Sequence, residues 1–194
     1  GDLRVKEHLD ADPEAELGYV METIRILRRE LAGRVPLIGF SGAPFTLATY
    51  LIEGGSSKGF FLTKKMMYTD PALYADLLNK ITDCTIEYLK AQAAAGVQAL
   101  QIFDSWVGVL APNDFAEFAL PYVQRIIAAL KASGVTVPII YFANNGATLL
   151  PQSLESGADV LGLDWRLPLD EAVKVVGQRV SLQGNMDPIA LLLP

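Results

Sequence analysis

The stretch Gly96-Val-Gln-Ala-Leu-Gln-Ile-Phe-Asp-Ser-Trp106 contains a glycine, an apolar run of strand length, and an aspartate with a tryptophan close behind it. The stretch Gly157-Ala-Asp-Val-Leu-Gly-Leu-Asp-Trp165 repeats that order. The glycine is typical of the residue that ends a helix, and the apolar run after it predicts a buried strand. The repeat therefore predicts a unit of strand and helix that is used more than once.

The rest of the chain alternates in the same way between short apolar runs and longer segments with helical spacing. The predicted strands cover residues 35–40, 99–103, 137–142, 160–163 and 180–183. The predicted helices cover residues 13–31, 45–52, 70–95, 112–130, 148–155 and 169–176. Strands that are almost continuously apolar are typical of a parallel sheet buried on both faces. We therefore predict one α/β domain over residues 1–194, with about five parallel strands.

Polar or otherwise unusual residues follow each predicted strand. They are Ser41-Gly42, Asp104-Ser105, Asn144-Asn145, Asp164, and Asn185 with Asp187. An active site at the carboxyl ends of parallel strands is typical of a TIM-like (β/α)8 barrel, whereas the glycine fingerprint of dinucleotide-binding sheets is absent. Because five strands cannot close such a barrel, two interpretations stay open. The chain forms an open doubly wound sheet, or it is an incomplete portion of a (β/α)8 barrel whose other strands lie elsewhere.

The composition restricts partners and location. With 51% hydrophobic and 20% charged residues, the chain is predicted to be globular. Its net charge of −6 argues against nucleic acid or an anionic membrane as a partner. No apolar run approaches membrane-spanning length, and the charged first residues do not resemble a signal peptide. Together with a single cysteine, these features predict a cytoplasmic protein.

Histidine and cysteine each occur once, as His8 and Cys84. A zinc site built from these residue types would need both, and a histidine-based triad would have to use His8, in a polar stretch with no strand before it. We therefore predict chemistry without a metal. Apolar neighbours at helical spacing predict that Cys84 is a buried thiol and not a reactive one.

Five segments carry a family resemblance. The longest is Pro36-Leu-Ile-Gly-Phe-Ser-Gly-Ala-Pro-Phe-Thr-Leu-Ala-Thr-Tyr-Leu-Ile-Glu-Gly-Gly-Ser-Ser-Lys58. The others are Ile102-Phe-Asp-Ser-Trp106, Leu120-Pro-Tyr122, the stretch 157–165 quoted above, and Gln183-Gly-Asn-Met-Asp-Pro188. Together they resemble the signature of the uroporphyrinogen decarboxylase family of haem and porphyrin biosynthesis, over essentially the whole chain.

This resemblance implies a TIM-like barrel that forms a cytosolic homodimer and uses neither a metal nor an organic cofactor. It implies a carboxy-lyase whose tetrapyrrole substrate, uroporphyrinogen III, loses carbon dioxide from four acetate side chains to give coproporphyrinogen III. Tyr50 matches the family's motif tyrosine, near the substrate carboxylates and the catalytic aspartate. Ser105 matches a residue that contacts substrate, and Phe103, just before it, lines the cleft.

Other parts of the family's site have no counterpart in these 194 residues. In the family, an arginine-rich segment and the catalytic aspartate precede the matched motifs, and a substrate-binding histidine follows them. His8 stands at the wrong end to match that histidine. The resemblance therefore implies an internal portion of the enzyme, which we expect to be inactive by itself.

The implied reaction agrees with the residue types. When an acetate on a pyrrole loses carbon dioxide, a protonated ring can accept the electrons, so that a tetrapyrrole is its own electron sink. The protein then has to orient carboxylates and hold an anion near the developing cation. Tyr50 and Ser105 supply neutral hydroxyl donors for this task. From spacing alone, Tyr50 is better explained as a core or interface residue and Ser105 as a cap of the next helix or turn. The match to the family's motif favours function for both.

The other polar residues near the strand ends have structural interpretations. Asp104 and Asp164 could form an acid–base pair, but we expect ion-paired carboxylates or acceptors of backbone N–H groups. Asn185 and Asp187 are expected to shape the loop before Pro188. Lys58, in the glycine-rich loop, is expected to be solvated and not to bind an anion.

Two alternative functions come from other classes. A corrinoid or thiol methyltransferase of the same superfamily would hold zinc with a His-x-Cys pair about where this chain has Tyr141-Phe-Ala-Asn144, and no such pair is present there. The second alternative is an inactive porphyrin-binding or dimerising module. Metal analysis tests the first alternative, and a decarboxylation assay tests the second.

Overall fold

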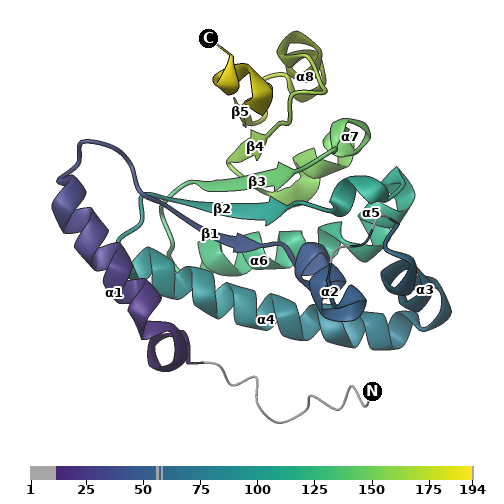
Figure 1. The fold of residues 1–194 in the computed structure, drawn as a ribbon, viewed down its shortest axis with the longest axis horizontal. Coiled ribbons are helices and arrows are strands. Elements are labelled where there is room, and N and C mark those ends of the chain that lie inside the picture. Colours follow the sequence, from purple (N-terminus) through teal and green to yellow (C-terminus); the bar gives the residue numbers. More distant parts are fainter. Residues whose placement is uncertain (1–11, 56, 58, 194) are drawn as a thin grey trace.

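A computed structural model describes residues 12–55, 57 and 59–193 of the chain (Figure 1). His8 and Lys58 lie outside these residues. The described part forms a layer of helices packed against one face of a five-stranded sheet, with further helices beyond the carboxyl ends of the strands.

All the strands of this sheet are parallel, and each pairs with the next one along the chain. They are β1 (Ile38–Gly42), β2 (Ala99–Asp104), β3 (Ile139–Ala143), β4 (Val160–Gly162) and β5 (Ser181–Gln183). A doubly wound sheet reverses its strand order at one point, whereas a (β/α)8 barrel does not. The order β1-β2-β3-β4-β5 therefore confirms the prediction of an incomplete portion of a TIM-like barrel with five parallel strands.

The predicted strand positions are correct except at their ends. β1 begins at Ile38 and continues to Gly42, whereas the predicted strand began at Val35, which is exposed. Pro36 has no N–H to donate to a neighbouring strand, which explains the later start.

Eight α-helices occur in the described residues. They are α1 (Pro13–Leu31), α2 (Pro44–Glu53), α3 (Phe61–Thr69), α4 (Pro71–Ala95), α5 (Pro112–Phe118), α6 (Leu120–Ala132), α7 (Leu150–Ser153) and α8 (Leu169–Val176). The Asp70 side chain accepts the Leu73 N–H at the start of α4, and Gly96 ends this helix with a φ of 108°. Among these helices, none combines the length and the apolar composition needed to cross a membrane.

The helix predictions need three corrections. Helix α3 is not in the predicted set, because Lys64 and Lys65 interrupt its apolar spacing and no side chain caps its start. The predicted helix 112–130 is two helices that meet at Ala119, because Pro121 cannot donate the N–H that would continue α5. The predicted helix 148–155 is the short helix α7 flanked by the 3-10 turns Ala147–Leu149 and Leu154–Ser156.

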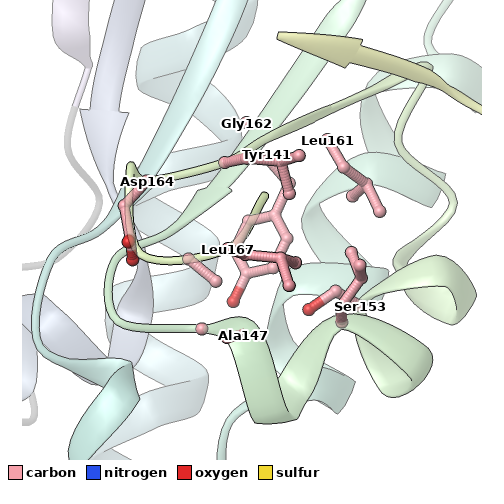
Figure 2. A pocket seen from close by; sticks show the side chains of 11 residues that line it. Tyr141, Ala147, Ser153, Leu161, Gly162, Asp164 and Leu167 are labelled. Atoms are coloured by element: carbon pink, nitrogen blue, oxygen red, sulfur yellow. The ribbon is translucent and has the colours of Figure 1, made fainter. Parts of the chain in front are cut away.

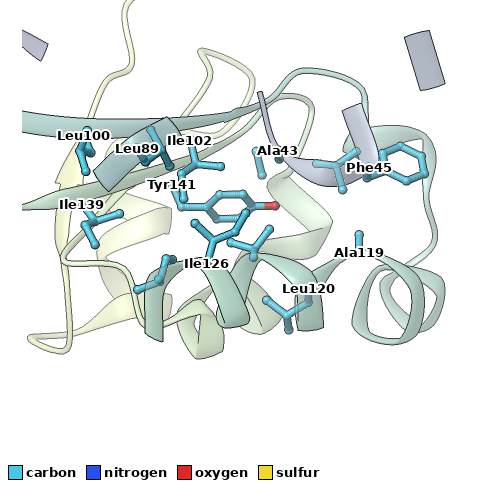
Figure 3. Close-up of a cluster of buried hydrophobic side chains, with 14 of the residues drawn as sticks. Ala43, Phe45, Leu89, Leu100, Ile102, Ala119, Leu120, Ile126, Ile139 and Tyr141 are labelled. Carbon is cyan, nitrogen blue, oxygen red and sulfur yellow. The ribbon is translucent and has the colours of Figure 1, made fainter. Parts of the chain in front are cut away.

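The hydrophobic core lies between the sheet and helices α4 and α6, which run beneath it (Figures 1 and 3). Leu100 and Ile102 of β2 point into this core, and Ile126 and Ile127 of α6 are almost fully buried opposite them. Figure 3 shows the ring of Tyr141, from β3, among these aliphatic side chains. The core therefore fixes every second residue of β2 and β3 on the helix side of the sheet.

The opposite face of the sheet carries aromatic side chains. The Phe103 ring stands edge-on to the rings of Phe40 and Phe142, at centroid distances of 5.8 and 6.0 Å. Phe40 is 60% exposed, so burial on both faces, as the sequence predicted, is wrong for β1 in the described residues. The faces of a barrel differ, since one faces the helices and the other faces the barrel interior.

The Gln92 side chain forms hydrogen bonds with the backbone at the outer edge of β1. Gln92 of α4 accepts the Phe40 N–H and donates to the Phe40 carbonyl, both at 2.9 Å. Gly39 makes this approach possible, because a Cβ at that position would stand 2.5 Å from Gln92 Oε1. The edge of β1 is therefore held by α4 at Phe40.

Candidate functional site

The three predicted site residues lie where β1 and β2 end. Phe103 belongs to β2, Ser105 follows that strand, and Tyr50 belongs to α2, which begins directly after β1. The Tyr50 ring stands edge-on to the ring of Trp106, with centroids 6.3 Å apart. The structure thus brings Tyr50 beside the segment that carries Ser105, whereas Phe103 contacts the other phenylalanines of the sheet.

Two hydroxyl groups at this position are available to a ligand. Tyr50 is 48% exposed, and Ser105 is half-buried. The Ser105 carbonyl accepts a hydrogen bond from Asn144 Nδ2 at 3.1 Å. Neither the Tyr50 nor the Ser105 hydroxyl bonds to another group of the described residues. Both can therefore donate to, or accept from, a bound molecule.

A buried carboxylate lies directly before Ser105. Asp104 is fully buried on the helix side of the sheet, where its Oδ1 accepts from Thr46 Oγ1 at 2.7 Å and its Oδ2 accepts from the Tyr141 hydroxyl at 2.8 Å. Burial raises the pKa of Asp104 to about 6, although both hydrogen bonds act in the opposite direction. Of the predicted partners of Asp104, no cation bonds it among the described residues, whereas the Thr46 backbone N–H does act on the carboxylate and lowers its pKa, beside the two side-chain hydroxyls.

Thr46 links this carboxylate to Trp106. Its Oγ1 accepts the Trp106 backbone N–H at 3.2 Å while its hydroxyl proton goes to Asp104. The Trp106 ring packs between Tyr50 and Phe60, whose centroid lies 5.3 Å away. Its Nε1 is buried and has no hydrogen-bond partner in the part of the chain that the structure describes. The Trp106 ring is therefore held by its backbone and by aromatic packing.

The equivalent aspartate of the second repeat has different partners. Asp164 accepts the backbone N–H groups of Asn145 at 2.6 Å and of Arg166 at 2.8 Å. The Arg166 guanidinium lies 3.4 Å from the Asp164 carboxylate and stacks 3.8 Å over the Trp165 ring. These contacts confirm the prediction that the Asp164 carboxylate is ion-paired or accepts backbone N–H groups.

In the loop after β5, Asn185 and Asp187 have the structural role that the sequence predicted. Asn185 Nδ2 donates to the Leu167 carbonyl, and the Asp187 carboxylate accepts the Ile189 N–H at 2.9 Å. Asp187 thereby caps the 3-10 helix Pro188–Leu192. In the glycine-rich loop, Ser57 Oγ accepts the Phe60 N–H at 3.0 Å.

Hollows also occur elsewhere in the described residues, the first at the carboxyl ends of β3 and β4 and the second beside α1. The first lies between β3, β4 and α7, where Tyr141, Ser153, Asp164 and Leu167 line it (Figure 2). Apolar side chains predominate there, and the Ser153 hydroxyl already bonds the Leu149 carbonyl.

The second hollow lies between α1, α2 and α4, where Cys84 lines it with Ser41 and Tyr88. Cys84 is half-buried, and desolvation raises the pKa of its thiol, so the reactive thiolate is disfavoured. Within the described ranges, no group of three or more histidine, cysteine, aspartate or glutamate side chains could hold a metal ion.

Sequence reasoning missed Thr46, Tyr141 and Lys64. The Lys64 ammonium donates to the Val109 carbonyl at 2.7 Å and joins α3 to the segment after β2. Thr46 lies inside the longest matched motif, four residues before Tyr50, and this helical spacing is the signal that could have placed the two on one face of α2. Tyr141 had no comparable signal, because its contact with Asp104 depends on strand pairing.

Comparison with known proteins gives a consistent result. Residues 2–194 match the family model described as uroporphyrinogen decarboxylase (URO-D). The uroporphyrinogen decarboxylase of Desulfotalea psychrophila is 65% identical over 183 residues, which cover 94% of this chain and 52% of that protein. The uroporphyrinogen decarboxylase of Carboxydothermus hydrogenoformans is 53% identical over 182 residues, covering 94% and 51%. The chain spans about half the length of the curated relatives it matches.

A solved structure of a methyltransferase from Methanosarcina mazei superposes with a TM-score of 0.79. The match covers 92% of this chain and 51% of the other, at 22% sequence identity. At that identity the likeness shows a common fold only.

Proposed function

Because the chain belongs to the uroporphyrinogen decarboxylase family, we propose that it supplies part of an enzyme that converts uroporphyrinogen III to coproporphyrinogen III. The reaction removes carbon dioxide from four acetate side chains and is that of a carboxy-lyase. The observation that carries the proposal is the 65% identity with a relative of that name over 94% of this chain. The unbonded hydroxyls of Tyr50 and Ser105 at the strand ends support it.

We propose that Tyr50, Ser105 and Phe103 contact the tetrapyrrole. Tyr50 and Ser105 would donate hydrogen bonds to its carboxylates, which accept them in two directions. Phe103, with Phe40 and Phe142, would offer pyrrole rings an apolar aromatic surface on the open face of the sheet.

For this reaction the protein has to position charged groups around the substrate. When carbon dioxide leaves, the electron pair of the broken C–C bond forms a C=C bond between the side-chain CH2 and the protonated pyrrole ring, which neutralises the ring cation. A proton from water then adds to the CH2, and the ring loses the proton that it gained first, which leaves a methyl group on the pyrrole. A group that holds the departing carboxylate in one orientation favours the loss of carbon dioxide, because the orientation is established before the bond breaks. Tyr50 and Ser105 would do this without adding charge. The family resemblance assigns the anion and the arginines to segments outside these 194 residues.

The resemblance also supports four further proposals. The chain forms part of one (β/α)8 domain, the enzyme is a homodimer, it acts in the cytoplasm, and it uses no cofactor. The net charge of −6 and the single cysteine agree with the proposed location.

A substitution at Tyr50 tests the proposed site. In the full-length protein that contains this sequence, we expect Tyr50→Phe to lower the rate of decarboxylation severalfold or more, because it removes one donor to a substrate carboxylate. The phenyl ring keeps the packing on Trp106, so the circular dichroism spectrum and the melting temperature should stay near those of the parent protein. Unchanged kinetics would remove Tyr50 from the site.

Two assays test the function itself. Turnover of uroporphyrinogen by the full-length protein supports the proposal, and stoichiometric zinc in the purified protein would instead favour a methyltransferase. The 194-residue chain, assayed in parallel, is expected to show no turnover by itself.

A further inference from the structure

We propose that Asp104 is a positioning residue, which holds helix α2, and with it Tyr50, against the segment that carries Ser105 and Trp106. The inference rests on the proposed function for its catalytic consequence. Its structural part, the fixed arrangement of Tyr50 and Trp106, can be measured separately.

Asp104 points toward the helix side of the sheet. In β2, Leu100, Ile102 and Asp104 face the helix side, and Phe103 between them faces the open side. Asp104 is therefore directed away from the surface on which Phe103 lies. It can affect a ligand on that surface only through the residues it bonds.

Those bonds link α2 and β3 to the end of β2. The Asp104 carboxylate joins Thr46 of α2 to Tyr141 of β3, so three elements meet at one buried group. The Thr46 hydroxyl has one proton, which it donates to Asp104, and this orients its lone pairs toward the Trp106 N–H. One threonine thus bonds residues on both sides of Ser105.

Thr46 and Tyr50 are about one helical turn apart in α2. Residues four apart lie one above the other on a helix, so both face the segment 104–106. Tyr50 completes the arrangement with its edge-on contact to Trp106, at a centroid distance of 6.3 Å. A shift of α2 at Thr46 would therefore move the Tyr50 ring relative to Ser105.

Burial of the Asp104 carboxylate opposes folding. Asp104 has two hydroxyl partners and, among the described residues, no cationic partner. A carboxylate buried in this way is expensive, and apolar residues of similar volume are often at least as stable. A fully bonded polar network instead specifies one arrangement of the elements that it joins.

The test uses the full-length protein with matched threonine variants. Thr46→Val removes the hydroxyl and keeps the shape, and Thr46→Ser restores the hydroxyl. Thr82→Val is the control, because Thr82 is also fully buried in a helix and bonds only a carbonyl of its own helix at 2.7 Å. We expect Thr46→Val to lower kcat about tenfold, since misplacing a catalytic group by a fraction of an ångström has effects of this order. Thr46→Ser should recover kcat, and Thr82→Val should leave it unchanged.

A double-mutant cycle separates positioning from general damage. If Thr46 acts by placing Tyr50, then Tyr50→Phe should have much less effect on kcat in the Thr46→Val background than in the parent protein. In the Thr82→Val background, Tyr50→Phe should keep its full effect. Full and independent effects of Thr46→Val and Tyr50→Phe would overturn the inference.

A spectroscopic measurement distinguishes this inference from the proposed function. With 5-fluorotryptophan incorporated, the ¹⁹F resonance of Trp106, assigned by Trp106→Phe, should shift in Thr46→Val, return in Thr46→Ser and stay in place in Thr82→Val. A protein that lacks decarboxylase activity but shows these shifts refutes the proposed function and keeps the structural part. A resonance that does not move in folded Thr46→Val refutes the inference whatever the activity. Tyr141→Phe removes the other donor to Asp104 and provides the same comparison if Thr46→Val does not fold.

Discussion

Asp104 and Asp164 occupy corresponding positions in the two repeats of one sequence pattern, yet their surroundings differ. Asp104 is enclosed by the helix layer and bonds two hydroxyls, whereas Asp164 bonds two backbone N–H groups and lies beside a guanidinium. The position of an aspartate at a strand end can therefore be recognised from the neighbouring residues in the sequence. The group that bonds its carboxylate cannot, because that group comes from another element. The elements opposite each strand end decide whether the charge is compensated.

The largest expected effect is that of Asp104 on the pH dependence of stability. The pKa of Asp104 is raised to about 6, above its ordinary value, so the folded state holds this proton to a higher pH than the unfolded chain does. The stability that this proton contributes is complete below about pH 4 and is lost as the pH rises to about 6, a change of about 3 kcal/mol. The titratable groups that interact with Asp104 are the phenols of Tyr141 and Tyr74, whose pKa values are raised further above their ordinary range.

Asp104→Asn should remove this dependence. Relative to the parent protein, the variant should therefore gain stability between pH 4 and pH 7, by up to about 3 kcal/mol. Urea denaturation at a series of pH values measures the effect, and Asp164→Asn is the comparison. A constant difference between Asp104→Asn and the parent across this range would show that Asp104 ionises normally.

The next largest effect is expected at the other aspartate. Asp164→Ala leaves the Asn145 and Arg166 N–H groups without their acceptor, so we expect a loss of about 2 kcal/mol at pH 7. Asp164→Asn keeps one side-chain oxygen and should lose about half as much. Equal losses for the two variants would mean that the backbone hydrogen bonds contribute little and that the charge matters most.

Tyr141→Phe is expected to have a smaller effect. It removes one of the two hydrogen bonds to Asp104, at a cost of about 1 kcal/mol. Because that bond lowers the pKa of Asp104, its loss should also raise the pKa and extend the fall in stability to higher pH. A denaturation profile that keeps the parent's shape would contradict the assigned role of Tyr141.

The smallest effect is expected for Arg166→Ala. Its ion pair and its stacking on Trp165 are partly exposed, and such contacts contribute about 0.5 kcal/mol. Salt should reduce the difference from the parent protein, because it screens exposed charges. A loss as large as that of Asp164→Ala would show that Arg166, and not the backbone, compensates Asp164.

Much of this architecture could be predicted from the sequence, and the remainder depends on distant contacts. Apolar runs and glycine helix ends located all five strands, because these signals lie within a few residues. The choice between a barrel and an open sheet came from the family resemblance, because local signals do not contain the order of the strands that the structure then confirmed. Motif matching selected Tyr50 and Ser105 as candidate site residues, and their roles stay predictions. The bond between Asp104 and Tyr141 joins residues far apart in the chain and follows from the parallel register that pairs Ile102 with Tyr141.

The Gln92 amide at the edge of β1 bears on association between molecules. An unpaired strand edge is a template on which another strand can add, and proteins block such edges to prevent aggregation. At Phe40 the two backbone groups that would bind an incoming strand already bind Gln92. Any strand that pairs with this edge, including the preceding strand of a (β/α)8 barrel, therefore has to displace the amide and exchange both bonds, so α4 occupies the edge at Phe40 as well as covering the core.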